Sequence, residues 1–191
     1  MQAFEKVIFL DRDGVINKNV KYEYVTSWAK FNFLPNVFEA LKLLKDNEFK
    51  VIIISNQQGV GKGLYTEAAL ADMTERMLAR IQSRGGKIHS VHYCPHLKEA
   101  DCVCRKPKVG LFKQALVGKS VDIKNTFFIG DTERDVETGK KLGCRTILVL
   151  SGNTESQAAV SDFKFQPDFI AKDLLAAVKN VVLKGKVKSW E

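Results

Sequence analysis

Five short apolar runs, rich in β-branched or aromatic residues, recur along this chain and alternate with longer segments of helical periodicity. The runs occupy residues 7–10, 51–55, 88–93, 126–129 and 146–150. Strands buried on both faces of a sheet read as continuous apolar runs, and their alternation with helices is typical of βαβ units. The sequence therefore predicts an α/β fold, a Rossmann-like parallel sheet flanked by helices.

Periodicity and capping residues indicate where the helices lie. One helix is expected to open near Phe38, and the others to cover residues 68–81, 132–142 and 173–183. Thr66 is a suitable N-cap for the second helix, which Gly85-Gly86 would stop, and Gly143 would end the third. The stretch over residues 151–168 reads as a loop.

The length of 191 residues suits one domain with a sizeable core, and the sequence holds no internal repeat. We expect a single domain over residues 1–191 with no separate cap domain, because no large insertion lies between Gly14 and Ser55 or between Ser55 and Lys106. The apolar run at residues 7–10 is too short for a signal peptide or a membrane span. A cytoplasmic protein without a membrane partner is therefore expected, and we also expect a monomer.

The net charge of +8, with a pI of about 9.3, favours an anionic partner. A phosphorylated metabolite, a nucleic acid and an anionic membrane surface would all satisfy this charge. Several of the lysines lie in the terminal segment 183–188, which reads as a solvated tail. The charge by itself does not choose among these partners.

Polar residues follow the predicted strands where a parallel sheet binds its ligands, at the carboxyl ends of the strands. The first strand runs into Asp11-Arg12-Asp13-Gly14, the second ends in Ser55-Asn56-Gln57, and the fourth ends in Gly130-Asp131 with Asp135 one helical turn further on. The third strand leads into a group of cysteines and then Arg105-Lys106. We expect these segments to meet in one site.

The carboxylates in these segments suit phosphoryl transfer. A carboxylate can attack a phosphoryl group if a divalent cation offsets the repulsion between the two anions and a second acid protonates the leaving oxygen. Asp11 and Asp13, two residues apart at a strand end, can divide these tasks. With Asp131 they offer the oxygen ligands that Mg²⁺ prefers.

Donors for the transferred phosphoryl oxygens are also present. The charge on those oxygens must meet preorganised hydrogen-bond donors. Ser55, with the backbone N–H groups beside it, and Lys106 can supply them. The sequence thus predicts a magnesium-dependent phosphatase that acts on a small phosphorylated metabolite.

A second group of residues has the composition of a structural zinc site. Cys94, His96, Cys102 and Cys104 offer three thiolates and one imidazole, enough for a closed tetrahedral Zn²⁺ centre in a loop over residues 94–104. The loop ends directly at Arg105-Lys106, so the metal would also fix the catalytic lysine. His89 and His92 are read as sheet or surface residues, and Cys144 as a core residue.

These motifs together resemble the haloacid-dehalogenase superfamily of phosphatases. The resemblance covers residues 7–150 and is carried by the segments at Asp11-Arg12-Asp13-Gly14, Ser55, Lys106 and Gly130-Asp131. It implies Asp11 as nucleophile, Asp13 as general acid and then base, Ser55 and Lys106 as phosphoryl stabilisers, and Asp131 as a magnesium ligand. An acid in the role implied for Asp13 should have a raised pKa.

The zinc loop is similar to that of two groups within this superfamily, the phosphatases of D-glycero-D-manno-heptose 1,7-bisphosphate and those of histidinol phosphate. The segment over residues 55–66 is more similar to the heptose group, which implies removal of the 7-phosphate. This resemblance implies that Arg105 binds the distal phosphate; pairing of Arg105 with Asp101 or Glu99 is the alternative. Residues 17–28 depart from the heptose pattern. The other substrate contacts implied are Arg12, Asn19, Lys21, Tyr24, Asn56, Gln57, Gln58 and Lys62.

Two further readings remain. A zinc-stabilised nucleic-acid-binding module would fit the charge and the cysteines, but such a module interleaves basic and aromatic residues along one face, whereas here the charge is scattered. A polynucleotide 3′-phosphatase would keep the chemistry and change the substrate. The zinc loop, however, is not part of the resemblance to polynucleotide 3′-phosphatases.

Overall fold

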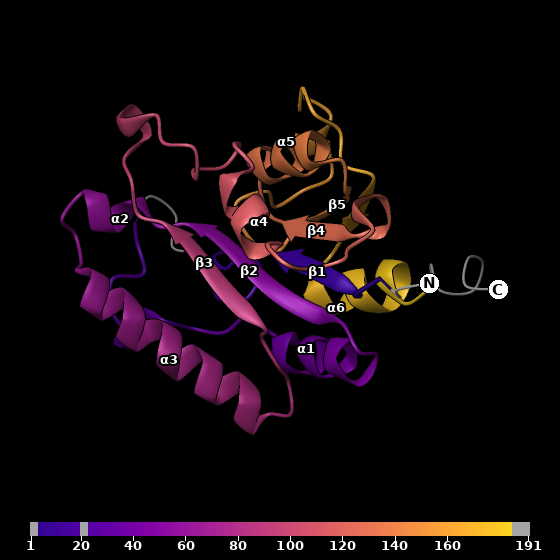
Figure 1. Cartoon of the computed structure of the whole chain (residues 1–191), viewed down its shortest axis with the longest axis horizontal. Helices are drawn as coiled ribbons and strands as arrows, with labels where there is room; N and C mark the ends of the chain where they lie inside the picture. Colours follow the sequence, from indigo (N-terminus) through magenta and orange to yellow (C-terminus); the bar gives the residue numbers. More distant parts are fainter. Residues whose placement is uncertain (1–3, 20–22, 185–191) are drawn as a thin grey trace.

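The structure, a computed structural model, describes residues 4–19 and 23–184, and Figure 1 shows a parallel sheet with helices on both sides. All neighbouring strands are parallel, in the order β3-β2-β1-β4-β5-β6. The strands are β1 (Val7–Leu10), β2 (Lys50–Asn56), β3 (Ser90–Cys94), β4 (Phe127–Gly130), β5 (Arg145–Val149) and β6 (Phe169–Ala171). The predicted parallel α/β fold is confirmed.

The strand prediction was incomplete at one edge of the sheet. All five predicted runs form strands, shifted by at most two residues, but no strand was predicted at β6, which lies between the expected loop over residues 151–168 and the expected helix over residues 173–183. β6 has only three residues and follows Pro167-Asp168. A run this short carries no periodicity, and its pairing with β5 supplies what the local sequence lacks.

Four of the helices were anticipated. They are α1 (Val37–Asp46), α3 (Glu67–Ser83), α5 (Glu133–Leu142) and α6 (Leu174–Ala177), the last continued by η5 (Val178–Val182). The Thr66 side chain accepts a hydrogen bond from the Ala69 N–H, which confirms the predicted N-cap. Gly143 ends α5 at a positive φ of 84°, which glycine adopts without strain.

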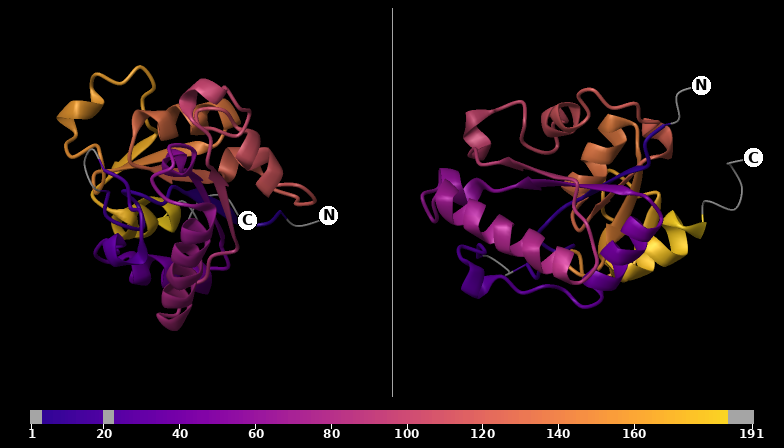
Figure 2. Two further views of the ribbon diagram at one scale, coloured as in Figure 1. Left: turned by 90° about the vertical axis from the view of Figure 1, so that its left-hand side faces the viewer. Right: turned by 60° about the horizontal axis from the view of Figure 1, so that its bottom comes forward.

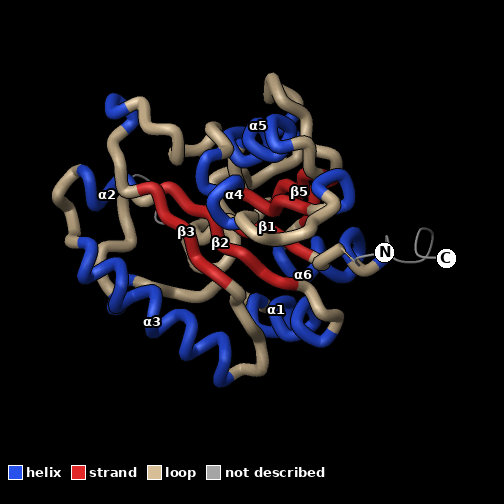
Figure 3. Tube along the Cα trace, viewed as in Figure 1, coloured by secondary structure: helices blue, strands red, loops and turns tan. Residues whose placement is uncertain are grey.

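Two shorter helices escaped prediction because neither spans enough turns to show a period. They are α2 (Gln58–Gly61) and α4 (Gly110–Ala115), and the 3₁₀ turns η1 (Trp28–Lys30), η2 (Lys98–Ala100), η3 (Ile123–Asn125) and η4 (Ala158–Val160) lie in the loops between the longer elements. Figure 3 shows the loops, in tan, that connect the helices and strands.

The helices divide between the two faces of the sheet, as the views in Figures 1 and 2 show. α1, α3 and α6 cover one face, and α4 and α5 the other. The side chains of β1 alternate accordingly: Ile8 and Leu10 join the larger core, while Val7 and Phe9 pack with Phe112 on the other side. Burial of both faces accounts for the continuous apolar runs.

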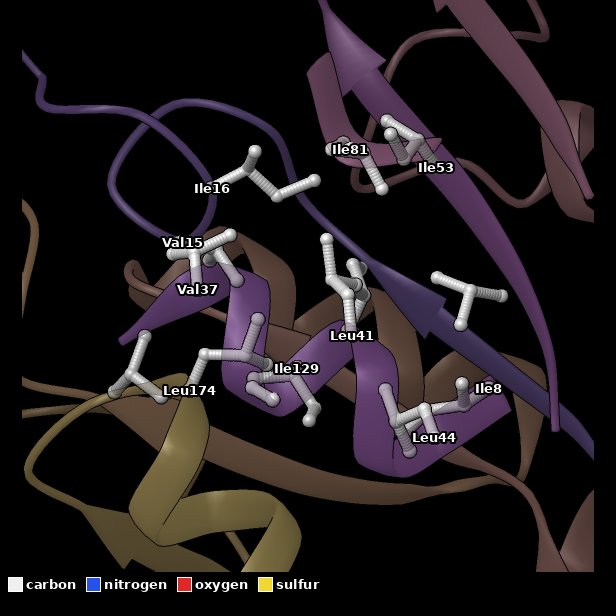
Figure 4. Packing of buried hydrophobic residues seen from close by; sticks show 14 of the residues in the cluster. Ile8, Val15, Ile16, Val37, Leu41, Leu44, Ile53, Ile81, Ile129 and Leu174 are labelled. Atoms are coloured by element: carbon white, nitrogen blue, oxygen red, sulfur yellow. The ribbon is translucent and has the colours of Figure 1, made fainter. Parts of the chain in front are cut away.

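Figure 4 shows the packing of the larger core at close range. Leu41 and Leu44 of α1 lie against Ile8 and Ile53 of the sheet, and Leu174 reaches the same cluster from α6. All of these side chains are buried. They hold the strands in register, and the strand ends carry the polar segments.

No helix within the described residues is long and apolar enough to cross a membrane. The terminal lysines beyond Lys184 lie outside the described residues, as does Lys21.

Candidate active site

A cleft of about 160 Å³ opens at the carboxyl ends of β1, β2 and β4. Its lining contains most of the residues predicted for the site, together with six that were not predicted as site residues: Glu23, Val25, Thr132, Arg134, Asp135 and Asn153. The predicted residues that line it are Asp11, Arg12, Asp13, Asn19, Tyr24, Ser55, Asn56, Gln57, Gln58, Arg105, Lys106 and Asp131. The strand ends therefore meet, as the sequence predicted.

Three buried carboxylates converge on the floor of this cleft. Asp11, Asp131 and Asp135 each offer an oxygen within 4.8 Å of the others. Burial raises the pKa of Asp131 to about 8 and that of Asp11 to about 6, and repulsion from Asp135 adds to both shifts. Such crowding of negative charge is relieved by a cation. The set of carboxylate oxygens fits a hard divalent ion such as Mg²⁺.

The Asp131 carboxylate uses one oxygen for support and leaves the other free. Its Oδ2 accepts hydrogen bonds from the backbone N–H and the side-chain amide of Asn153, at 2.7 and 2.9 Å. Its Oδ1 is buried and has no hydrogen-bond partner within residues 4–19 and 23–184. A buried acceptor left unpaired is costly, and a bound cation would satisfy it.

Two glycines let the backbone pack directly on Asp131. A Cβ at Gly14 would lie 2.2 Å from its Oδ2, and one at Gly152 would lie 2.1 Å from the same atom. Gly14 also has a φ of 84°, which glycine adopts without strain. Both the close approach to Asp131 and the backbone conformation therefore require glycine at this position.

Asp135 was noted at a strand end but was not predicted as a site residue. Its Oδ2 accepts from the Thr132 hydroxyl at 2.6 Å and from the Thr132 N–H at 3.2 Å, a capping arrangement that opens α5. Its Oδ1 lies 2.6 Å from the Lys106 Nζ. The signal that could have identified it is its spacing, since Asp131 and Asp135 flank the first turn of one helix.

Lys106 is held over the floor by two ion pairs. Its Nζ lies 3.1 Å from Asp11 Oδ1 as well as 2.6 Å from Asp135, and these carboxylates raise the pKa of Lys106 although burial opposes the shift. The Asn56 side chain makes two hydrogen bonds with the backbone of Lys106. The Lys106 N–H donates to Asn56 Oδ1 at 3.0 Å, and Asn56 Nδ2 donates to the Lys106 carbonyl at 3.1 Å. The amide of Asn56, predicted as a substrate contact, is thus engaged in placing Lys106.

Asp13 lies apart from the three-carboxylate cluster. Its carboxylate accepts from Arg12 Nη2 at 2.9 Å, from Asn17 Nδ2 at 2.8 Å and from Gln57 Nε2 at 2.8 Å. The expected rise in its pKa is wrong for this structure: burial favours a rise, but the Arg12 charge and these hydrogen bonds outweigh it and lower the pKa. Gln57 also donates to Ser55 Oγ at 3.2 Å.

A chain of hydrogen bonds forms one wall of the cleft. Arg105 Nη2 donates to Gln58 Oε1 at 2.9 Å, and Gln58 Nε2 donates to the Tyr24 hydroxyl at 2.6 Å. Lys62 does not line the cleft, but its Nζ lies 5.3 Å from the centre of the Tyr24 ring. The alternative pairing of Arg105 is not seen, since Asp101 binds Lys108 instead.

The cysteine and histidine side chains gather as predicted. Cys94, His96, Cys102 and Cys104 each offer an atom within 4.8 Å of the others, and none of the cysteines is in a disulfide. The sulfur–sulfur distances are 3.2 to 3.5 Å, and His96 Nδ1 lies 3.2 Å from Cys104 Sγ. Tetrahedral Zn²⁺ with bonds of about 2.3 Å sets sulfurs about 3.7 Å apart, so the cluster has close to the required size.

The remaining sulfur and imidazole side chains take no part in either site. His92 bonds to Ser90 on β3, His89 lies just before that strand, and the buried Cys144 donates to the Gly139 carbonyl at 3.5 Å. Arg12, whose guanidinium is bound to Asp13, is almost fully buried and has little surface to offer a substrate.

Comparison with known proteins finds relatives that are phosphatases. A family model described as HAD-hydrolase-like matches residues 103–177. D-glycero-alpha-D-manno-heptose-1,7-bisphosphate 7-phosphatase of Photorhabdus laumondii is 35% identical over 160 residues, which cover 80% of this chain and 86% of the relative. The corresponding beta-anomer phosphatase of Pasteurella multocida is 32% identical and covers 89% of this chain and 93% of its own length.

Solved structures agree with these sequences. The crystal structure of D,D-heptose 1,7-bisphosphate phosphatase from B. bronchiseptica, complexed with magnesium and phosphate, superimposes with a TM-score of 0.86 at 28% identity. The match covers 94% of this chain and 99% of that one. The similarity therefore extends over nearly the whole of both proteins.

Proposed function

The chain belongs to the family of HAD-like D-glycero-D-manno-heptose-1,7-bisphosphate 7-phosphatases, and from this we propose that it hydrolyses the 7-phosphate of that sugar bisphosphate through an aspartyl-phosphate. The observation that carries the proposal is the floor of the cleft, where Lys106 faces three buried carboxylates. This arrangement brings a nucleophile, a cation site and a hydrogen-bond donor for the phosphoryl oxygens within a few ångströms of one another.

Asp11, Asp131 and Asp135 would hold Mg²⁺, which when bound offsets the repulsion between the anionic nucleophile and the phosphoryl group. Asp11 attacks phosphorus, the bond from phosphorus to the sugar oxygen breaks, and that oxygen takes a proton from Asp13. Asp13 then takes a proton from water, whose oxygen attacks phosphorus and releases Asp11 with inorganic phosphate. Lys106 and Ser55 donate to the phosphoryl oxygens throughout.

Asp13 must gain a proton before it can act as the acid. In the substrate-free protein the Arg12 charge and three donors favour its carboxylate form. An incoming phosphate dianion places negative charge beside Asp13, and a like charge raises a carboxyl pKa. The acid form is therefore favoured when substrate is bound.

Arg105 is proposed to bind the phosphate that does not react. Its guanidinium is held by neutral groups, the Gln58 amide oxygen and the His96 carbonyl at 3.3 Å, so its charge is not cancelled. Guanidinium groups bind phosphate in bidentate fashion. Gln58, which itself donates to the Tyr24 hydroxyl, orients the Arg105 side chain. We propose that structural Zn²⁺ in the cysteine cluster fixes the loop that leads into Arg105.

The test is a panel of substrates with Asp11→Asn as the inactive blank. We expect kcat/KM to be highest for heptose 1,7-bisphosphate, with histidinol phosphate and a 3′-phosphorylated oligonucleotide far lower. The blank should lose at least about 10³-fold in kcat, because removal of a nucleophile leaves only the rest of the site. Asp46→Asn, which breaks an exposed pair with Lys42, is the matched control. Comparable rates on all three substrates would contradict the proposed substrate.

A further inference from the structure

Arg134 is a cleft-lining cation at a position where a helix disfavours positive charge. It lies in the first turn of α5, directly before Asp135, and its side chain is exposed. The first turn of a helix presents free N–H groups and the positive end of the macrodipole. Local helix stability therefore gives no reason for an arginine at this position.

The acids near Arg134 are engaged elsewhere. Glu137 pairs with Lys141 at 2.7 Å, and Glu133 accepts from the backbone N–H groups of residues 164 and 165. Asp135 is bound by Lys106 and by the capping hydroxyl of α5. In the described parts of the chain no carboxylate forms an ion pair with Arg134, so its guanidinium is available to an external anion.

The cations around the cleft fall into two pairs. Arg12 is neutralised by Asp13, and Lys106 by the carboxylates of the floor. Arg105 and Arg134 are the two cleft-lining cations for which the described residues provide no carboxylate. Each cation of the floor thus has a carboxylate partner, whereas the two arginines at the rim have none among the described residues.

Each rim arginine is next in sequence to one member of an ion pair on the floor. Lys106 and Asp135 form an ion pair of 2.6 Å between the zinc loop and α5. Arg105 immediately precedes one member of that pair, and Arg134 immediately precedes the other. Both side chains line the cleft that contains this ion pair.

We propose that Arg134 is a specificity-determining residue that binds the second, non-reacting phosphate of the substrate together with Arg105. The inference rests on the proposed function and extends it to a residue outside the motifs. Two guanidinium groups can match a phosphate dianion in charge and in hydrogen-bond geometry, which one cannot. A sugar monophosphate has no group to place there.

The experiment compares kcat/KM for heptose 1,7-bisphosphate with kcat/KM for the same sugar carrying only the 7-phosphate. We expect the ratio to fall at least tenfold in Arg134→Ala, mainly through KM for the bisphosphate. Arg134→Lys, which keeps the charge but not the fork of donors, should lie between Arg134→Ala and the wild type. Arg80→Ala removes an equal charge from exposed α3, away from the cleft, and should keep the wild-type ratio.

A double variant separates a shared ligand from two independent effects. If Arg105 and Arg134 bind one phosphate, the loss in Arg105→Ala/Arg134→Ala will differ from the product of the single losses. A ratio that Arg134→Ala leaves unchanged, including a parallel fall for both substrates, overturns the role of Arg134 alone. A wild-type enzyme that does not prefer the bisphosphate overturns the proposed function as well.

Discussion

At the scale of single residues, the site depends on side chains that hold the reacting groups in place. Asn153 occupies one oxygen of Asp131 with two hydrogen bonds, and the buried Oδ1 is left without a partner among the described residues. Groups that orient a metal ligand commonly affect metal affinity as much as activity. Asn153 was not predicted, because it lies in a loop with no recognisable motif.

Asn153→Ala should weaken Mg²⁺ binding about tenfold, since the backbone N–H remains but the side-chain amide is lost. Calorimetric titration of the substrate-free protein with Mg²⁺ measures this without reference to turnover. Asn125→Ala, which removes an exposed amide that donates to Asp122, is the control. Unchanged Mg²⁺ affinity in Asn153→Ala would show that the amide has no part in the cation site.

At the scale of elements, the loop over residues 94–104 connects the cysteine and histidine cluster to Lys106, the proposed phosphoryl-binding lysine. Cys94 ends β3 and is buried in the core that contains Phe9 and Phe112. The loop then leads directly to Arg105 and Lys106. The His96 carbonyl also accepts from the Arg105 guanidinium. The order of this loop therefore determines where two cleft-lining cations lie.

Purified protein should contain about one Zn²⁺ per chain, and chelation should lower the melting temperature by several degrees and reduce turnover, because structural zinc contributes directly to folding. Elemental analysis and thermal unfolding measure these effects. Cys104→Ser should lose the metal, whereas Cys144→Ala, outside the cluster, should retain it. Active protein without zinc would exclude the proposed metal.

A second element-scale contact ties β6 and α5 to β5. The Asp168 carboxylate accepts from the Thr146 N–H at 2.7 Å, from its hydroxyl at 2.8 Å and from Lys140 at 2.5 Å. These bonds lower the pKa of Asp168, although burial opposes them. Because the folded-state pKa is lower than the unfolded-state value, this stabilisation is present above the unfolded pKa and is lost as pH falls through the folded pKa.

Asp168→Asn should therefore lower the free energy of unfolding by about 1 kcal/mol at pH 7, at the low end for bonds to a charged group because the side chain is a third exposed. The difference from wild type should shrink below about pH 4, where the unfolded carboxyl protonates. Urea denaturation at several pH values measures it, with Asp72→Asn on exposed α3 as the control. A difference independent of pH would contradict an electrostatic origin.

At the scale of the whole molecule, the proposed site needs only one chain. The strand ends, the loops and helices α2 and α5 of one chain together line the cleft. The large hydrophobic side chains exposed among the described residues are scattered: Phe4, Leu64, Val103 and Val117. Scattered single residues do not make an interface. Light scattering should thus report one species of about the chain mass, 21.4 kDa. A stable species of twice that mass would contradict a monomer.

The sequence by itself determined the sheet and the location of the site. Strands buried on both faces must be apolar throughout, so β1, β2 and β4 were visible as runs, and polar segments after them had to meet at one edge. The metal-ligand chemistry of the cysteine cluster was equally local. Those predictions depended on residue type and spacing, which a sequence states directly.

Only the tertiary structure decided which side chain faces which. It turned Asp13 toward Arg12 and brought Asp135 onto the floor, it engaged Asn56 with the backbone of Lys106, and it added β6 through pairing with β5. Such choices depend on strand order, on helix entry angles and on the rotamers that packing allows. These are properties of elements distant in sequence, so no local pattern contains them.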